Sequence, residues 1–245
     1  MKLKNKIALV TGGSRGIGAG IVRKLAEEGA TVAFTYVGSE KFAEDIVNEI
    51  KAKDGRALAI LADSSDPKAV TDAVNQAAKT FGGLDILVNS AGISKGGMID
   101  DLSLEDFDLT FKINVRAVFV AIQAALKHMK AGGRIINIGS NTVKFFSFPG
   151  ASAYVMSKAA VAGLTSSLAR DLGPREITIN AVHPGPTATD MNPDGTEFAT
   201  TVKQLMPFKK YGKPEEIGSV VAFLASGEAS FINGTSIVAD GGQTA

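Results

Sequence analysis

The stretch "VTGGSRGIGAG", residues 10 to 20, decides the fold because it places a glycine-rich turn between an apolar run and a helical pattern. Gly12, Gly16 and Gly18 have the spacing G-x-x-x-G-x-G and follow the run "KIALV" at 6–10. Glycine lets the backbone turn tightly and approach a pyrophosphate, while the amino end of a helix offers free N–H groups and a positive dipole. A turn that merely needs flexible residues is the alternative, but this position between a strand and a helix favours a dinucleotide site.

Short apolar runs rich in β-branched residues recur along the chain. They are "KIALV" (6–10), "TVAFTY" (31–36), "ALAIL" (57–61), "DILVN" (85–89), "RIINIG" (134–139), "TINAV" (178–182) and "SIVAD" (236–240). Near-continuous apolar strands of this kind suit a parallel sheet that is buried on both faces.

Segments with helical periodicity lie between these runs, at 42–53, 66–81 and 104–129, with Pro67 at a first helical position. Strand and helix therefore alternate, which predicts a doubly wound parallel α/β sheet of the Rossmann type flanked by helices. We expect one domain over residues 1–245, with ligands at the carboxyl ends of the strands.

The composition excludes several classes of function. The 245 residues carry 26 Lys and Arg against 25 Asp and Glu, so the chain lacks the positive excess that nucleic-acid binding needs. Without cysteine and with two histidines, we expect no thiolate or histidine-rich metal site. The apolar run near the N-terminus ends at Gly12 and Gly13, too early for a signal peptide or a membrane span, so we expect a cytoplasmic protein with no membrane partner.

The end of the second strand indicates which dinucleotide is preferred. An Asp or Glu there would hold the ribose 2′-hydroxyl of NAD, whereas a 2′-phosphate calls for cationic groups. The sequence has Tyr36 at that position, with Arg15 from the glycine loop able to reach it and with Ser39 and Lys41 as further donors. This pattern favours NADP(H) over NAD(H). The alternative is that Arg15 is only a solvated charge on the loop.

Polar residues stand at the ends of later strands and on the helices beside them. Asn89 ends the fourth strand, Ser140 follows the fifth, and Asn114 lies within a helical segment. Tyr154 and Lys158 are four residues apart and therefore share one face of a helix. Each of them alone has an ordinary structural explanation, such as a turn, a cap or a core contact.

Seven motifs occur in a fixed order along the chain: "TGGSRGIG" (11–18), Asp63 after the third strand, "NSAG" (89–92), Asn114, Ser140, "YVMSK" (154–158) and "HPGPTATDM" (183–191). This ordered set resembles the short-chain dehydrogenase/reductase family over essentially the whole chain. The resemblance implies a single Rossmann-type domain with a sheet of about seven parallel strands, and a homotetramer or homodimer.

The same resemblance implies which residues form the site. Its catalytic set is Asn114, Ser140, Tyr154 and Lys158. Its cofactor contacts are Gly12, Ser14, Arg15, Gly16, Ile17, Gly18, Tyr36, Ser39, Asp63, Ser64, Asn89, Ala91, Gly92, Tyr154, Lys158, Pro184, Gly185, Thr187 and Thr189.

In the family's chemistry, Tyr154 would be the general acid in carbonyl reduction and the general base in alcohol oxidation. Ser140 would orient the substrate oxygen, Lys158 would bind ribose and tune the phenol, and Asn114 would hold the water of a proton relay. A phenol has a pKa of about 10, so lowering it by roughly three units requires about 4 kcal/mol of preferential stabilisation of the phenolate. We expect the Lys158 ammonium to supply that stabilisation, aided by the positive charge of an oxidised nicotinamide.

The sequence departs from the family pattern at two points. Tyr154 stands fourteen positions after Ser140, one more than the commonest spacing, so we expect the intervening loop to bulge. Ser90 replaces the second Asn of the usual N-N-A-G, which we expect to change hydrogen bonding behind the cofactor rather than the chemistry.

The segment 183–214 has no strand pattern, and within it we expect a flexible substrate lid at about 187–211. Its apolar residues and those after Ser140 predict an apolar pocket for a ketone or a β-ketoacyl group, although packing in a core or an interface is the alternative. The candidate wall residues are Phe145, Phe146, Phe148, Met191, Phe198, Leu205 and Met206.

Within the family, the chain looks most like the 3-oxoacyl-(acyl carrier protein) reductases and related carbonyl reductases. Arg175 matches a basic position that docks the carrier protein in those enzymes, and Lys127 or Lys130 could add a contact; a solvated helix end is the alternative. The other readings are an alcohol, sugar or steroid dehydrogenase of the same family, an epimerase or dehydratase of the wider superfamily, and a dinucleotide-binding sensor without chemistry.

Overall fold

The computed structural model describes residues 1–38, 40–145 and 148–245. All seven expected strands are present within one or two residues of their predicted ends. They are β1 (Ile7–Thr11), β2 (Thr31–Tyr36), β3 (Ala57–Leu61), β4 (Ile86–Asn89), β5 (Arg134–Ile138), β6 (Thr178–Pro184) and β7 (Ser236–Ala239).

The strands form one parallel sheet in the order β3-β2-β1-β4-β5-β6-β7. The order reverses between β1 and β4, which pair in register with Leu9 opposite Leu87 and Thr11 opposite Asn89. A reversal of this kind opens a crevice at the carboxyl ends of the strands, where α/β proteins bind their ligands. The doubly wound Rossmann-type architecture predicted from the sequence is confirmed.

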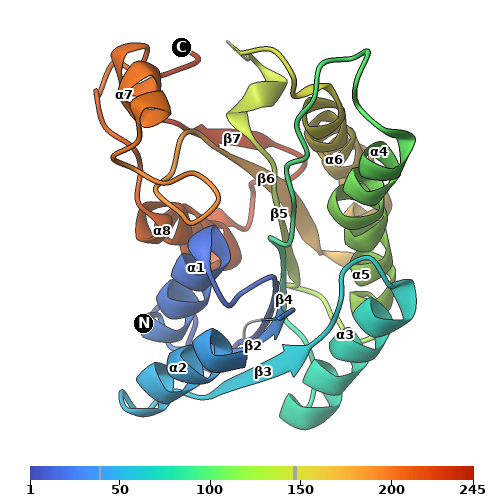
Figure 1. Ribbon diagram of the computed structural model, residues 1–245. Coiled ribbons are helices and arrows are strands. Elements are labelled where there is room, and N and C mark those ends of the chain that lie inside the picture. Colours follow the sequence, from blue (N-terminus) through green and yellow to red (C-terminus); the bar gives the residue numbers. More distant parts are fainter. Residues whose placement is uncertain (39, 146–147) are drawn as a thin grey trace.

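Two layers of helices cover the sheet, as Figure 1 shows. One layer consists of α1 (Gly16–Glu27), α2 (Glu40–Lys51) and α8 (Pro214–Ala225). The other consists of α3 (Pro67–Phe81), α4 (Leu104–Phe111), α5 (Ala117–Ala125) and α6 (Ser152–Leu172). Because the sheet is buried on both faces, alternate residues of one strand belong to separate cores: Leu9 packs on the α3 and α5 side and Val10 on the α1 and α8 side.

Local sequence explains several helix ends. Asp66 accepts a hydrogen bond from the N–H of Lys68 at 2.8 Å and so caps α3, whose first residue is Pro67 as expected. Ser103 caps α4 in the same way through the N–H of Asp106. Short 3-10 turns lie at Asn141–Val143, Gly173–Arg175 and Gly227–Ala229.

The single helix predicted at 104–129 is only partly right. The structure interrupts it with a π-helical turn, Lys112–Arg116, and α5 ends at Ala125. The extra residue in a π turn rotates the helix after it, and such turns are frequent at functional sites. Asn114 lies in the middle of this turn and is buried.

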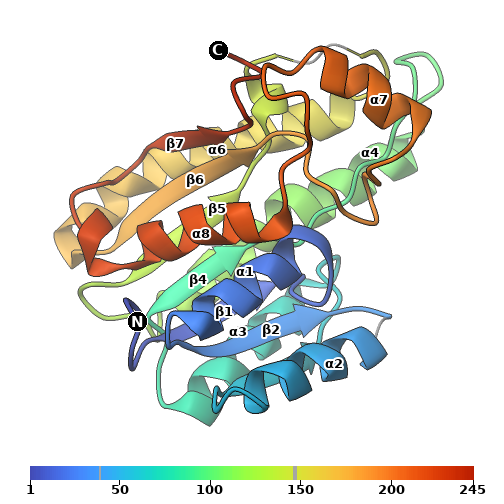
Figure 2. The ribbon, with the colours of Figure 1, turned by 90° about the vertical axis from the view of Figure 1, so that its left-hand side faces the viewer.

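The segment predicted as a lid contains a helix, α7 (Glu197–Gln204), which Figure 2 shows above the carboxyl end of the sheet. It has a small core of its own, formed by Ala199, Val202, Met206 and Tyr211. Phe148 packs against this core, and its ring lies 5.0 Å from that of Phe198. This segment therefore has a packed core of its own that contacts the loop after β5.

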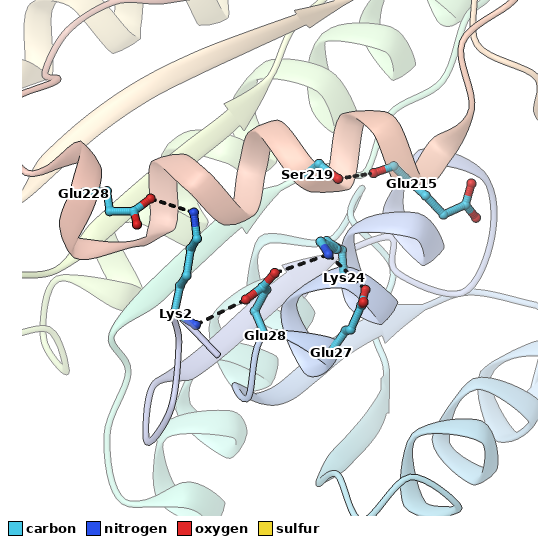
Figure 3. Close-up of polar contacts among 7 residues, drawn as sticks. All are labelled: Lys2, Lys24, Glu27, Glu28, Glu215, Ser219 and Glu228. Carbon is cyan, nitrogen blue, oxygen red and sulfur yellow. Dashed lines mark hydrogen bonds and ion pairs between the residues drawn. The ribbon is translucent and has the colours of Figure 1, made fainter.

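Helices α1 and α8 approach each other closely because glycine faces glycine. A Cβ on Gly218 would lie 2.8 Å from Gly20 O, and a Cβ on Gly20 would lie 2.5 Å from the backbone of Pro214. Charged residues that are exposed or partly exposed lie near this contact, and Figure 3 shows Lys2 bonded to Glu228 and Lys24 bonded to Glu27 and Glu28. No helix among the described residues is long and apolar enough to cross a membrane.

Candidate active site

The glycine loop has the backbone that the motif predicts. Gly12 and Gly16 have φ of +66° and +54°, a region that favours glycine. A Cβ on Gly12 would lie 2.8 Å from the Cα of Ala91, and one on Gly18 would overlap Gly12 O. The loop is held to β2 because the N–H of Gly12 donates to Thr35 Oγ1 at 2.9 Å. Glycine is thus required here by close backbone packing as well as by conformation.

Arg15 occupies the cap position of α1, and no side chain among the described residues caps that helix end. The first backbone N–H groups of α1 are therefore free to bind a phosphate. A cavity of about 300 Å³ lies beside the loop, lined by Ser14, Arg15 and Gly16 and by Thr189 from the lid segment. Arg15 is exposed and half-buried Tyr36 ends β2, so the predicted corner for a 2′-phosphate has a cation and no carboxylate at the strand end.

The other predicted cofactor contacts lie at the carboxyl edge of the sheet. Asp63 and Ser64 follow β3, and Asp63 accepts a hydrogen bond from the N–H of Ser65. Ile17 lies in the first turn of α1. Pro184 ends β6, followed by Gly185, buried Thr187 and Thr189. Ser39 lies outside the described residues.

Ser140 and Tyr154 are brought together across the loop that follows β5. Ser140 is buried with an extended backbone, and its Oγ accepts from the N–H of Thr142 at 3.3 Å. Burial raises the pKa of the Tyr154 phenol, and a side-chain hydrogen bond to Ser140 lowers it by less. The predicted lowering of this pKa is wrong for the protein without cofactor, because desolvation of the phenolate outweighs the stabilising contact.

Lys158 lies one turn after Tyr154 on α6, as predicted, and only 6% of it is exposed. Its Nζ donates to Ile138 O at 2.9 Å and lies 5.7 Å from the centroid of the Tyr154 ring. Lys158 makes no ion pair within residues 1–38, 40–145 and 148–245. Burial lowers the pKa of its ammonium to about 8.

Asn114 is fixed by three hydrogen bonds. Its Nδ2 donates to Ile93 O and to Ser157 Oγ, and its Oδ1 accepts from the N–H of Ile93 at 2.9 Å. Ser157 in turn donates to Tyr154 O at 2.7 Å, which links the π turn to the catalytic helix. A Cβ on Gly92 would lie 3.3 Å from Asn114 Oδ1 and 3.4 Å from Lys158 Nζ, so these two groups lie beside the "NSAG" turn.

The sequence reasoning missed Ser157, although it stands next to Lys158 within "YVMSK". It also missed Asn137 on β5, which accepts from Asn89 at 2.8 Å and donates to Thr165 at 2.9 Å. A polar residue inside an otherwise apolar strand was the available signal. The Oδ1 of Asn89 is buried without a hydrogen-bond partner among the described residues.

The residues at this edge of the sheet fit a dinucleotide. A loop that only glycine can form, an uncapped helix end, an exposed arginine and an open buried acceptor are all found at one edge of the sheet. An open acceptor there fits a ligand with hydroxyl donors, as a nucleotide ribose has. No group of three or more His, Asp or Glu among the described residues could hold a metal ion.

Both departures from the family pattern lie next to turns at the carboxyl edge of the sheet. The longer loop after Ser140 begins with the 3-10 turn Asn141–Val143, and its Phe146 lies outside the described residues. At Ser90 the turn is held through its backbone, with Thr11 Oγ1 accepting from the N–H groups of Ser90 and Ala91 at 3.0 and 3.1 Å.

The candidate wall residues separate into two groups. Phe145, Met191, Phe198 and Leu205 are at least half exposed, whereas Met206 is buried in the lid's own core. Met206 therefore supports the lid rather than the wall of a pocket.

Comparisons with known proteins agree with this geometry. The model of the family described as "Enoyl-(Acyl carrier protein) reductase" matches residues 12–244. A "Cyclic-di-GMP-binding biofilm dispersal mediator protein" of Escherichia coli is 44% identical over 236 residues, which are 96% of this chain and 96% of that protein.

Two solved structures are similar over the full length of both chains. A short-chain dehydrogenase/reductase from Serratia marcescens is 53% identical with a TM-score of 0.98. A short-chain dehydrogenase from Burkholderia cenocepacia, in complex with NADP, is 51% identical with a TM-score of 0.98. The chain described here belongs to the short-chain dehydrogenase/reductase family of oxidoreductases.

Proposed function

We propose that this protein is an NADP(H)-dependent reductase that converts a ketone or β-ketoacyl carbonyl into an alcohol, with Tyr154 as the general acid. The observation that carries the proposal is the cluster of buried Ser140, partly buried Tyr154 and buried Lys158, which has no ion-pair partner among the described residues, beside a glycine loop that suits a dinucleotide. NADPH would supply the hydride, and the residues of this chain would bind, orient and protonate.

The raised pKa of Tyr154 fits a general acid, because the phenol keeps its proton in the protein without cofactor. A phenol that holds its proton at neutral pH can donate it to a carbonyl oxygen. The Ser140 hydroxyl is close enough to the phenol to lower its pKa and is suited to hold the same substrate oxygen. In alcohol oxidation the tyrosine would act as base, and it would then need additional positive charge nearby.

Lys158 has two proposed tasks, which are to bind a ribose hydroxyl and to stabilise negative charge on Tyr154. Its pKa of about 8 keeps the ammonium mostly charged at neutral pH, even though it is buried. Asn114 is held rigidly at the π turn, where it would position the water of a proton path, and Ser157 supports it.

The preference for NADP(H) is attributed to Arg15 and to the lack of an acid at position 36. A guanidinium binds phosphate with paired hydrogen bonds, whereas a carboxylate would repel it. The NADP complex of the relative from Burkholderia cenocepacia supports this assignment.

The substrate is proposed to have an apolar tail, because exposed Phe145, Met191, Phe198 and Leu205 lie after Ser140 or in the lid segment. Delivery as an acyl carrier protein thioester is the narrower proposal. It rests on Arg175, whose guanidinium donates to Leu126 O at 2.7 Å while remaining exposed, and on nearby Lys127 and Lys130. An alcohol, sugar or steroid would use the same catalytic residues with different lid contacts.

A non-catalytic dinucleotide sensor is the second candidate, because the Escherichia coli relative is named for binding cyclic-di-GMP. Against it, Ser140, Tyr154 and Lys158 are all present. Mixing the protein with NADPH and a panel of β-keto esters, acetoacetyl thioesters and cyclic ketones separates the two. Loss of NADPH absorbance supports the reductase, and binding without turnover on any of them supports the sensor.

We further propose that the protein is a homotetramer. The outer faces of α4, α5 and α6 form an apolar groove of about 580 Å³ that includes Phe111, Phe119, Ala160 and Leu164, and Phe119 is 45% exposed. A surface of this kind suits burial against another copy. Light scattering on the protein and on Phe119→Glu tests it: a tetramer that the substitution weakens supports the proposal, and a wild-type monomer contradicts it.

A further inference from the structure

His183 lies near the carboxyl end of β6 and is completely buried. Its Nδ1 is 3.1 Å from Ser140 N and 2.9 Å from Ser140 O, while its Nε2 is 3.0 Å from Ser236 Oγ on β7. The imidazole therefore connects three neighbouring strands at the point where the catalytic serine leaves β5.

The ring occupies space that only a glycine leaves free. A Cβ on Gly139 would lie 2.5 Å from His183 Cε1 and closer still to Nδ1. The N–H of Gly139 donates to Val182 O at 2.7 Å, so the sheet ladder continues up to this residue. The peptide of Ser140 is thus the first one beyond the strand, and the imidazole holds it from the side.

Either neutral tautomer of His183 can hydrogen-bond the Ser140 peptide. With a bare Nδ1 the ring accepts from the N–H of Ser140, and with a protonated Nδ1 it donates to Ser140 O. The Ser236 hydroxyl can donate or accept at Nε2 and satisfies both forms. Burial lowers the pKa of His183, and the charges of Lys158 and Lys144 lower it further, so the ring is neutral at neutral pH.

We propose that His183 is a positioning residue, which fixes the Ser140 peptide so that the serine hydroxyl stays beside Tyr154. The inference deepens the proposed reductase function and rests on it. Displacement of a catalytic group by about 1 Å can lower the rate on the order of a hundredfold. Loss of the contact between His183 and the Ser140 peptide should therefore have a measurable effect on kcat. His183 itself touches neither substrate nor cofactor in this assignment.

The test compares three substitutions at one position. His183→Asn keeps a polar atom where Nδ1 stands, His183→Gln keeps one nearer to Nε2, and His183→Leu keeps neither. His128→Leu is the matched control, because His128 is the chain's other histidine and bonds Asn75 away from the site. For each variant we would measure NADPH affinity by fluorescence, kcat on the best carbonyl of the panel, and amide hydrogen exchange of residues 138–143 without cofactor.

We expect His183→Leu to lose about 10- to 100-fold in kcat with NADPH affinity within about threefold of wild type. His183→Asn should recover most of the loss, His183→Gln should recover less, and exchange at 138–143 should be faster in the leucine variant than in the asparagine variant. Equal kcat in the leucine variant and wild type, or equal exchange and rate in all three variants, would overturn the proposal. If wild type turns over no carbonyl, the reductase function fails, while the exchange comparison still decides whether His183 holds Ser140.

Discussion

Lys24 and Lys158 carry the same ammonium group in opposite surroundings. Lys24 lies on α1 near the amino end of the sheet and pairs with Glu27 and Glu28 at 3.0 and 3.2 Å (Figure 3). Its hydrogen bond to Glu27 is the largest of the contacts that raise its pKa. Lys158 is buried near the carboxyl end, bonds a backbone carbonyl, and has its pKa lowered to about 8 by burial.

The difference between the two lysines shows where burial of a charge lowers the stability of the fold. Solvent-accessible ion pairs such as those of Lys24, whose side chain is 22% exposed, contribute between 0 and about 1 kcal/mol each. A buried ammonium without a carboxylate partner opposes folding instead, and groups with strongly shifted pKa values gather at functional sites. The contrast therefore points to chemistry at the carboxyl end and to ordinary stabilisation at the other.

Removal of the phenol beside Lys158 is expected to have the largest effect. Tyr154→Phe should lower kcat for carbonyl reduction by about a thousandfold, because general acid catalysis contributes on the order of 10² to 10⁴. NADPH affinity, measured by fluorescence, should stay within about threefold. Tyr211→Phe is the control, because Tyr211 belongs to the lid core, and it should keep kcat within about threefold. Comparable losses in both variants would show that the phenol at 154 has no special role.

Replacement of Lys158 should separate activity from stability. Lys158→Met should reduce kcat by about a hundredfold and weaken cofactor binding, yet stabilise the cofactor-free protein at pH 7 by up to about 3 kcal/mol, the value of a pKa change from 10.5 to about 8. Lys24→Met, the matched control, should cost less than about 1 kcal/mol. Urea unfolding of both variants gives the comparison.

The pH dependence of unfolding has a definite sign in this account. Between pH 8 and 10.5 the unfolded chain keeps the Lys158 proton that the folded protein has lost, so this group makes the free energy of unfolding rise with pH across that window. Lys158→Met should lack this rise. A wild-type profile identical to that of the methionine variant would mean that Lys158 is not desolvated.

An intermediate effect is expected for the exposed charge at the glycine loop. Arg15→Ala should weaken NADPH binding by about 10- to 100-fold and leave NADH binding within about twofold, because only NADPH has the 2′-phosphate. Arg23→Ala is a control from the same cavity, since the Arg23 guanidinium is already paired with Glu49 at 2.7 Å. An equal loss of NADPH and NADH affinity would contradict this prediction. It would mean that Arg15 binds the pyrophosphate, which both cofactors have.

The smallest effect is expected where the chain begins. Lys2→Ala removes the 2.7 Å contact with exposed Glu228 and should cost about 0.5 kcal/mol of unfolding free energy, less at high salt. Cofactor affinity should not change. A decrease of more than about 2 kcal/mol in the free energy of unfolding, measured with urea, would contradict this. It would show that the ion pairs around α1 and α8 contribute more to stability than ordinary surface pairs.

The sequence predicted the sheet well because each strand is an apolar run bounded by turn residues, and parallel strands bury both faces. It missed the break in the helix at 104–129, since one extra residue in a π turn shifts the helical pattern too little to be recognised within a mostly apolar segment. The direction of the Tyr154 pKa was wrong, because the motif shows which groups are neighbours but not how little water reaches them. The roles of His183 and Ser157 depend on contacts between distant strands and helices, which spacing alone does not reveal.

The central claim is that the Ser140, Tyr154 and Lys158 cluster protonates a carbonyl that receives hydride from NADPH. The most direct test supplies NADPH deuterated at both C4 positions together with the carbonyl panel, and analyses the products by mass spectrometry. We expect an alcohol that carries one deuterium on the former carbonyl carbon, formed by wild type and nearly absent with Tyr154→Phe. Bound NADPH with no deuterated alcohol from any carbonyl, or equal product from both proteins, would contradict it.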